Sequence, residues 1–261
     1  MSRAKVRDNF IGEVEKRQDT WYYLSMAKRL TLLIDADDTV LDFNASEYQA
    51  VVKLAEDYSL GDGDAIAQEF KRINRRMWDM FERGEITREE IFYTRFYELF
   101  DKFGIKGKDV TQVGDAYREN VAESTCVIRG ARAFLERTVC EHDLYCVTNG
   151  VTRTQKMRFK NTRLDKFFKK IYISQEIGLQ KPNKDFFDYV LKDIGITQKE
   201  DVYIIGDSLS SDIQGGINAG IKTVLFNRER KLVKDIVPDY QVKNYRELTR
   251  LIDKLAEKER V

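Results

Sequence analysis

Three carboxylates lie within four residues at Asp35, Asp37 and Asp38, directly after an apolar run at residues 30–34. Carboxylates this close repel one another, and each is costly at the dry end of a buried strand unless a cation neutralises it. The cluster is therefore a candidate for carboxylate chemistry assisted by a hard metal ion. A polar turn in which an Asp or a Thr caps the next segment would give the same local pattern.

A hydroxyl, an amide and a flexible backbone follow a second apolar run, at residues 144–147. They belong to Thr148, Asn149 and Gly150. Such groups suit the binding of an oxyanion, although an ordinary helix start uses the same residue types.

A lysine and two more carboxylates follow the next two apolar runs. Lys181 comes after the run at residues 171–173 and precedes a proline, whereas Asp207 and Asp212 follow the run at residues 202–205. An Asp at a helix start is also an ordinary cap. Each signal has a structural explanation, but four of them in this order, each at a predicted strand end, indicate one shared site.

The composition narrows the protein classes. A chain of 261 residues with 42% hydrophobic and 34% charged side chains fits one or two ordinary globular domains. A net charge of +1 lacks the excess of positive charge that is typical of proteins that bind a nucleic acid polymer. No apolar run approaches the ~20 residues of a membrane span, and the first residues lack the apolar segment of a secretory signal. We therefore expect a cytoplasmic protein.

Histidine and cysteine chemistry is nearly excluded. The one histidine, His142, rules out zinc motifs with two histidines, and its charged neighbours predict a surface position rather than a nucleophile–histidine site. The cysteines Cys126, Cys140 and Cys146 form no C-x-x-C pair, which predicts reduced core thiols rather than ligands or disulfides.

The elements that position these groups follow from apolar periodicity. Residues 43–125 have helical spacing and no strand signal, whereas short apolar runs alternate with helical stretches after about residue 130. Alternation of this kind predicts a doubly wound α/β core with a parallel sheet, here residues 26–42 and 126–261, with a helical domain inserted after the first strand. Ligands of such sheets bind at the carboxyl ends of the strands, where the polar groups lie.

Two details concern the ends of these segments. The polar residues 1–25 form an extension that an appended helix or an upstream translation start would explain equally, with Met26 as the other candidate start. The helical insert is predicted to begin at Asn44, as the N-cap, with Glu47 as its N3 partner.

Together the motifs resemble the haloacid dehalogenase superfamily of phosphatases. The matching residues are Asp35-Ala36-Asp37-Asp38-Thr39 for D-x-D-x-T, Val147-Thr148 for the strand that ends in Thr or Ser, Lys181 for the third motif, and Gly206-Asp207 with Asp212 for G-D-x-x-x-x-D. The resemblance covers about residues 29–257 and implies a Rossmann-like core with a helical C1-type cap, since the insert has the position and length of that cap.

Three stretches resemble the 5′-nucleotidase branch typified by YjjG and YfnB, namely residues 41–44, 73–87 and 207–220. This resemblance implies a Mg²⁺-dependent hydrolase of nucleoside 5′-monophosphates, with pyrimidine and deoxyribose forms preferred. Its partner would be a small phosphate ester, with no nucleic acid polymer and no membrane, and the protein would be a monomer or a homodimer.

The resemblance also implies a role for each motif residue. Asp35 is the expected nucleophile, and Asp37 is the expected acid that protonates the leaving oxygen and then activates water. The expected ligands of Mg²⁺ are Asp35, the backbone carbonyl of Asp37, and Asp207. Asp212 is expected to contact these ligands rather than the ion itself. The groups expected to hold the phosphoryl oxygens are Thr148, Asn149 and Lys181.

Substrate choice would depend on the entrance loop and the cap. Phe43 could stack on a base, while Asn44 and Asn74 could hydrogen-bond the edge of that base. Trp78 lies one helical turn from Asn74, and we expect it to pack inside the cap.

Three alternatives remain open. A sugar-phosphate phosphatase or phosphomutase shares all four motifs. A 2-haloacid dehalogenase would need neither Mg²⁺ nor a second acid, so Asp37 and the Asp207/Asp212 pair argue against it. An inactive binding module would be expected to have lost at least one motif residue, and none is missing.

Overall fold

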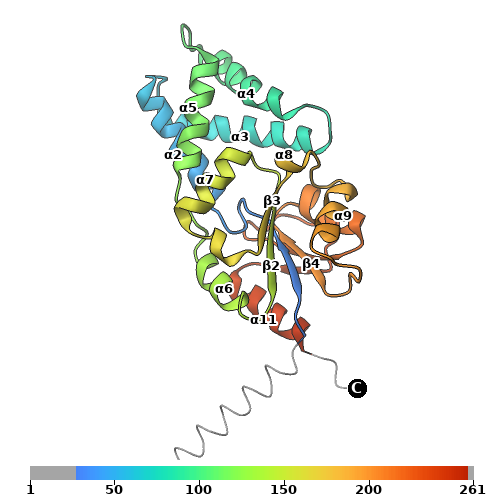
Figure 1. Ribbon diagram of the computed structural model, residues 1–261. Helices are drawn as coiled ribbons and strands as arrows, with labels where there is room; N and C mark the ends of the chain where they lie inside the picture. Colours follow the sequence, from blue (N-terminus) through green and yellow to red (C-terminus); the bar gives the residue numbers. More distant parts are fainter. Residues whose placement is uncertain (1–27, 258–261) are drawn as a thin grey trace, which may run out of the picture.

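The computed structural model describes residues 28–257, so the predicted extension at residues 1–25 lies outside the described residues. One parallel sheet of six strands runs in the order β3-β2-β1-β4-β5-β6 (Figure 1). The strands are β1 (Thr31–Ile34), β2 (Asp143–Thr148), β3 (Lys170–Ile173), β4 (Val202–Gly206), β5 (Lys222–Phe226) and β6 (Tyr240–Val242). The four apolar runs named above fall on β1 to β4, and β6 is a short strand at the sheet edge.

The helices form two groups, one that packs against this sheet and one that makes up the insert. Those of the core are α6 (Ala131–Thr138), α7 (Thr152–Thr162), α8 (Ser174–Ile177), α9 (Lys184–Asp193), α10 (Gln214–Ala219) and α11 (Tyr245–Ala256). Those of the insert are α2 (Phe43–Asp57), α3 (Gly63–Glu82), α4 (Arg88–Phe103) and α5 (Val110–Glu123). Figure 1 shows the second group gathered at one end of the core. The prediction of a Rossmann-like core with a helical cap is confirmed.

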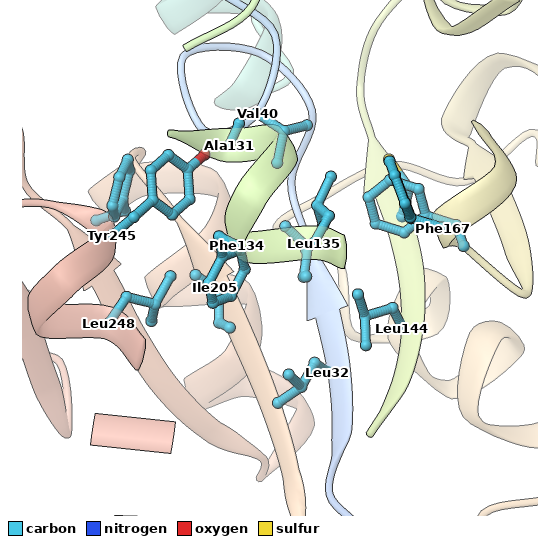
Figure 2. Packing of buried hydrophobic residues seen from close by; sticks show 14 of the residues in the cluster. Leu32, Val40, Ala131, Phe134, Leu135, Leu144, Phe167, Ile205, Tyr245 and Leu248 are labelled. Carbon is cyan, nitrogen blue, oxygen red and sulfur yellow. The ribbon is translucent and has the colours of Figure 1, made fainter. Parts of the chain in front are cut away.

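Alternating side chains of the central strand fill the two faces of the sheet. Leu32 and Ile34 of β1 belong to a buried cluster that includes Phe134 of α6 and Leu248 of α11 (Figure 2). Leu33, between them, belongs to a second cluster with residues of α9 and α10. Since successive strand residues point to opposite faces, this short apolar run is explained by burial on both sides.

Strand pairing sets the position of the candidate residues. Ile34 lies opposite Cys146 in β2 and Ile205 in β4, so Asp35 begins level with the last residues of both neighbouring strands. The backbone N–H of Asp35 donates to the carbonyl of Ile205 at 2.9 Å, which continues the pairing one residue past β1. The carboxyl ends of the three central strands therefore converge at one place.

The cap begins two residues before the position predicted for its N-cap. The N-cap of α2 is Asp42, whose Oδ1 accepts from the backbone N–H of Ala45 at 3.0 Å, so the prediction of Asn44 as the N-cap is wrong. Both residue types are good caps, and an anionic carboxylate has the further advantage of the positive end of the helix dipole.

A buried polar group links three helices inside the apolar cap. Arg95 donates to Oδ1 of Asn74 at 2.8 Å, and Nδ2 of Asn74 donates to Oε1 of Glu47 at 2.5 Å. The guanidinium of Arg95 lies 4.5 Å from the centre of the Tyr117 ring, a cation–π contact. Trp78 packs against the apolar cluster of the cap, with its ring edge-on to a neighbouring phenylalanine, as expected.

The prediction of a surface position for His142 is wrong. Its side chain is buried, and Nδ1 accepts from the backbone N–H of Leu30 at 3.3 Å. Burial lowers the pKa of His142, so the ring is a neutral acceptor at neutral pH. The ring lies where β1 and β2 begin, at the opposite end of these strands from Asp35. Charged neighbours in the sequence were therefore no guide to the direction of this one side chain.

The cysteine prediction holds only in part. All three cysteines are free thiols, but Cys146 alone is buried, whereas Cys126 is partly exposed and Cys140 is exposed. Within residues 28–257, no helix is both long enough and apolar enough to cross a membrane.

Glu47 should make the stability of the protein depend on pH. Burial raises the pKa of Glu47 from about 4.5 to about 7, despite its hydrogen bond from Asn74. The native state therefore holds this proton at a pH where the unfolded chain releases it, so its contribution to stability is present below about pH 4.5 and is lost as the pH rises through about 7. As the pH rises from about 4.5 to about 7, the free energy of unfolding of Glu47→Gln should increase by about 1–3 kcal/mol relative to that of wild type.

Urea unfolding at a series of pH values measures this difference. Glu56→Gln, on an exposed position of the same helix, is the matched control and should follow wild type. Parallel stability curves for wild type and Glu47→Gln would contradict the account of this buried carboxyl group.

Candidate active site

One buried ammonium group joins the carboxyl ends of the central strands. Nζ of Lys181 donates to Oδ1 of Asp35 at 2.6 Å and to Oδ1 of Asp212 at 2.6 Å, and it donates to the carbonyl of Val147 at 2.9 Å. Burial alone would lower the pKa of Lys181, but Asp212 and Asp35 outweigh it and raise that pKa. Lys181 is therefore a permanent cation between two carboxylates.

The carboxylates around Lys181 carry more negative charge than the lysine can balance. Burial raises the pKa of Asp35 well above its usual value; Lys181 opposes this shift, and the charges of Asp212, Asp207 and Asp37 add to it. Within residues 28–257, ligand oxygens of Asp35, Asp207 and Asp212 lie within 4.8 Å of one another. Such an excess of negative charge, with hard oxygen donors, suits a divalent cation.

The hydrogen bonds of Asp212 separate it from the other two carboxylates. Its Oδ1 accepts from Lys181 and its Oδ2 accepts from the backbone N–H of Ser208 at 3.1 Å, so both oxygens are occupied by the protein. Gly206 makes room for this carboxylate, because a Cβ at that position would lie 2.1 Å from Oδ2 of Asp212. Asp35 and Asp207 thus fit Mg²⁺ as direct ligands, with Asp212 in support.

A second lysine, which the sequence reasoning missed, touches the same cluster. Nζ of Lys231 donates to Oδ2 of Asp207 at 2.6 Å and to the backbone carbonyl of Asp207 at 3.0 Å. Burial raises the pKa of Asp207, and Lys231 opposes this shift. Lys231 lies in the loop after β5, and no spacing rule marks it in the sequence.

Asp38, the third carboxylate of the segment that follows β1, faces the cap. Its Oδ1 accepts from the backbone N–H of Asn44 at 3.1 Å, and burial raises its pKa to about 7. Asn44 therefore lies beside the carboxylate cluster, and its contact with a substrate stays a prediction. A shallow pocket here is lined by Asp38, Asn44, Asp207, Phe226, Arg228, Glu229 and Lys231.

Two donors from one helix hold the carboxylate of Asp37. Arg158 of α7 pairs with Oδ1 of Asp37, and Nε2 of Gln155 donates to Oδ2 of Asp37 at 2.6 Å. Nε2 of Gln155 also donates to Oγ1 of Thr148 at 2.9 Å, so the predicted acid and the predicted oxyanion ligand share one partner. Sequence reasoning missed both helix residues, although polar side chains three apart on a buried helix face are a signal that could have found them.

The loop after β2 fixes Lys181. Nδ2 of Asn149 donates to the backbone carbonyl of Lys181 at 2.8 Å, and Oδ1 of Asn149 accepts from the backbone N–H of Lys181 at 3.0 Å. Oγ1 of Thr148 accepts from the backbone N–H of Gly150 at 3.0 Å. Asn149 is thus next to Lys181, and Thr148 is bound by Gly150 and Gln155 in the adjoining position of the same segment. The amide of Asn149 is occupied in holding that lysine, and its contact with a phosphoryl group stays a prediction.

The predicted cap residues separate into two places. Phe43 lies beside α7, where the guanidinium of Arg158 is 5.6 Å from the centre of its ring. Asn74 is instead 2% exposed, and both ends of its amide are bound by Glu47 and Arg95 within the cap. The structure therefore brings Phe43 and Asn44 to the site and leaves Asn74 in the interior of the cap.

The cap also touches the core on the side away from its connections. Arg88 of α4 donates to Oγ of Ser174 at 2.8 Å and to the carbonyl of Asn149 at 3.4 Å. Oγ of Ser210, in the short helical segment Leu209–Ile213 after β4, donates to Glu82 at the end of α3. The cap thus lies against the segments that follow β2, β3 and β4, and covers the place where Asp35 and Lys181 meet.

The parallel sheet, the inserted helices and the four motifs at the strand ends define the class of protein. Residues 32–226 match the family of haloacid dehalogenase-like hydrolases, and the chain belongs to this family. The resemblance inferred from the motifs is confirmed.

Three curated relatives align over most of the chain. The HAD-hydrolase YfnB of Bacillus subtilis is 38% identical, covering 87% of this chain and 97% of its own length. Pyrimidine 5′-nucleotidase PynA of Streptococcus pneumoniae is 34% identical, covering 85% and 94%. Pyrimidine 5′-nucleotidase YjjG of Escherichia coli is 30% identical, covering 85% and 97%.

A solved structure agrees in fold. The crystal structure of YfnB from Bacillus subtilis bound to magnesium, described as revealing interdomain movement, has a TM-score of 0.81 and 39% sequence identity. The similarity covers 86% of this chain and 99% of the YfnB chain.

Mg²⁺ should stabilise the protein through Asp207. Because a cation bound only to the native state raises stability by about 2.7 kcal/mol at one hundred times its dissociation constant, saturating Mg²⁺ should raise Tm by about 5–10 °C. Asp207→Asn should remove most of this rise, since it removes a ligand that is partly buried in the cluster.

Thermal melts with and without Mg²⁺ measure this effect. Asp165→Asn, an exposed carboxylate on the core, is the control and should keep the full rise. An undiminished rise in Asp207→Asn would place the cation elsewhere.

Proposed function

We propose that this protein is a Mg²⁺-dependent phosphomonoester hydrolase that acts on nucleoside 5′-monophosphates through an aspartyl-phosphate on Asp35. The observation that carries the proposal is the buried contact of Asp35 with Lys181. Asp35 comes two residues before Asp37 and lies beside the carboxylate of Asp207. Membership of the family and the names of PynA and YjjG support the same reaction class.

The metal site would be formed by Asp35, Asp207 and the backbone carbonyl of Asp37. When bound there, Mg²⁺ supplies the screening that a carboxylate and an anionic phosphate ester need in order to approach each other. The donor set supports this assignment, because Asp35 and Asp207 offer hard oxygens while both oxygens of Asp212 are occupied by the protein.

In the first step, a carboxylate oxygen of Asp35 attacks phosphorus and the bond from phosphorus to the ribose oxygen breaks. Asp37 gives its proton to that leaving oxygen. In the second step, Asp37 takes a proton from water, the water oxygen attacks phosphorus, and phosphate and the Asp35 carboxylate are released. The Thr148 hydroxyl accepts from Gly150 and Gln155, so its own proton would be donated to a phosphoryl oxygen. Lys181 would act on the phosphoryl group through its positive charge, because its three N–H groups are donated to Asp35, Asp212 and Val147.

Selectivity for nucleotides would come from the entrance formed by the first turn of α2. Phe43 offers an aromatic face, and Asn44 lies next to the carboxylate cluster through its contact with Asp38. Stacking on an aromatic ring contributes roughly 1–3 kcal/mol per base, or about 5- to 150-fold in kcat/KM. The preference for pyrimidine bases is supported by the names of two relatives, and the preference for deoxyribose forms stays a prediction.

The nucleophile has the most direct variant test. Asp35→Asn should lower kcat for phosphate release from dUMP by on the order of 10³ or more, because an amide cannot form the acyl phosphate. Its Tm should be unchanged or slightly raised, since one charge leaves a crowded anionic site. A folded Asp35→Asn enzyme with turnover close to wild type would contradict the mechanism.

A panel of nucleoside monophosphates, sugar phosphates and p-nitrophenyl phosphate, with and without Mg²⁺, tests the substrate class. We expect nucleotides to exceed sugar phosphates in kcat/KM. Phe43→Ala should reduce turnover of dUMP much more than that of p-nitrophenyl phosphate, whereas Phe43→Tyr should keep the aromatic face and the preference. If a hexose or triose phosphate outran every nucleotide, the alternative of a sugar-phosphate phosphatase would replace the nucleotidase, with the same chemistry at Asp35.

A further inference from the structure

Arg158 stands between Asp37 and the cap. It is 1% exposed, its NH1 pairs with Oδ1 of Asp37, and its NH2 donates to Oγ of Ser46 at 3.3 Å. Its guanidinium also lies 5.6 Å from the centre of the Phe43 ring. Since Asp37 belongs to the loop after β1, and Phe43 and Ser46 belong to the first turn of α2, Arg158 contacts the core and the cap at once.

Ser46 is also part of the connection between the two domains. Its Oγ lies 2.8 Å from Oγ of Ser124, which caps the end of α5, the last helix of the cap. The two connecting segments run side by side, because the backbone N–H of Asp42 donates to the carbonyl of Cys126 at 3.1 Å. The hydrogen bond from Arg158 to Ser46 therefore reaches the point where both connections leave the core.

The contacts of Arg158 are specific rather than general packing. A buried guanidinium is costly to desolvate and is tolerated only with good partners, and an apolar side chain would fill the same space at lower cost. Within residues 28–257, the one carboxylate paired with Arg158 is Asp37. The second oxygen of Asp37 is held by Gln155, three residues earlier on α7, so the whole carboxyl group is oriented from this helix.

We propose that Arg158 is a positioning residue that fixes the Asp37 carboxyl group toward the leaving oxygen and makes this orientation depend on the seating of the cap connections. The inference rests on the proposed function, because it assigns Asp37 the transfer of a proton to the leaving group. It adds a residue outside the four motifs and a physical link between the cap and the proton donor.

The consequence is a dependence on the leaving group. A misplaced Asp37 fails to protonate the departing oxygen, and a well-placed general acid contributes about 10²- to 10⁴-fold. Phenyl phosphate needs that proton, because phenolate is a strongly basic leaving group. Its p-nitro derivative has nearly the same size and departs readily without the proton. Loss of cap packing or of overall folding would affect both esters alike.

The test compares kcat/KM for these two esters in wild type, Arg158→Lys and Arg158→Met. This parameter reports the step that releases the leaving group and not the later hydrolysis of the aspartyl-phosphate, in which Asp37 acts alike for both esters. Lysine keeps the charge but has a single point of attachment, so it cannot bind Asp37 and Ser46 as the guanidinium fork does. We expect kcat/KM for phenyl phosphate to fall about 10²-fold in Arg158→Met and about 10-fold in Arg158→Lys, with less than about 3-fold loss on the p-nitro ester.

Arg153→Met is the matched control. Arg153 lies on the same helix and pairs with Glu119 of α5 at 2.8 Å, so it also links the core to the cap, but its ion pair does not involve Asp37. Both esters should be hydrolysed by this variant at wild-type rates.

Two further measurements keep the test decisive if the buried Arg158→Met chain does not fold. Ser46→Ala removes the hydrogen bond from Arg158 together with those that Ser46 makes to Asp42 and Ser124, all at the connections. It should lower kcat/KM for phenyl phosphate about 3- to 10-fold, in the same selective way. In an Asp37→Asn background, Arg158→Lys should cause no additional loss, because a residue that acts through Asp37 has nothing left to position.

Equal losses of kcat/KM on the two esters, or full additivity with Asp37→Asn, would overturn the role of Arg158 and leave the proposed function standing. A wild-type protein that hydrolyses neither ester nor any nucleotide with Mg²⁺ present would overturn the proposed function, and this inference with it.

Discussion

Two carboxylates, those of Asp35 and Asp212, lie within hydrogen-bond distance of a single buried ammonium group, that of Lys181. Without that cation, the charges that converge at the strand ends would repel one another in a dry environment. The third contact of Lys181, with the carbonyl of Val147, ties the same group to β2. Asn149 holds the lysine backbone from the loop after β2, so the site depends on three adjacent strands ending at one level.

The cap adds a second constraint, because it limits the access of water to the cluster of Asp35, Lys181 and Asp212 and affects how Asp37 is held. Electrostatic interactions strengthen when water is excluded, so the contacts of Arg88 and Glu82 with the core loops bear on the chemistry beneath them. Arg158 extends the same dependence to Asp37, the proposed proton donor, because Arg158 is bound by Asp37 and by the first turn of α2. The position of the cap and the orientation of Asp37 are therefore parts of one arrangement.

Sequence reasoning predicted most of the sheet and the groups at its strand ends. Apolar runs are local signals, and their alternation with helices predicts a parallel sheet whose strand ends bring Asp35, Lys181 and Asp207 together, as the structure shows. The same reasoning missed Arg158 and Gln155, because a buried polar residue on a helix is recognised only once its partner is known. His142 and Asn74 were misplaced for a related reason, since neighbouring charges and helical spacing do not fix where one polar side chain finds its partner. The edge strand β6 has three residues, too few for a periodic signal.

The central claim, that Asp35 becomes covalently phosphorylated, is tested most directly by trapping. Wild-type enzyme is mixed with dUMP and Mg²⁺, quenched within a turnover and treated with borohydride, which reduces an acyl phosphate to an alcohol. Mass spectrometry of the digested chain then locates the reduced side chain. The account predicts homoserine at position 35, formed only when substrate and Mg²⁺ are both present. Homoserine at another acidic residue, or none in an enzyme that is releasing phosphate, would contradict it.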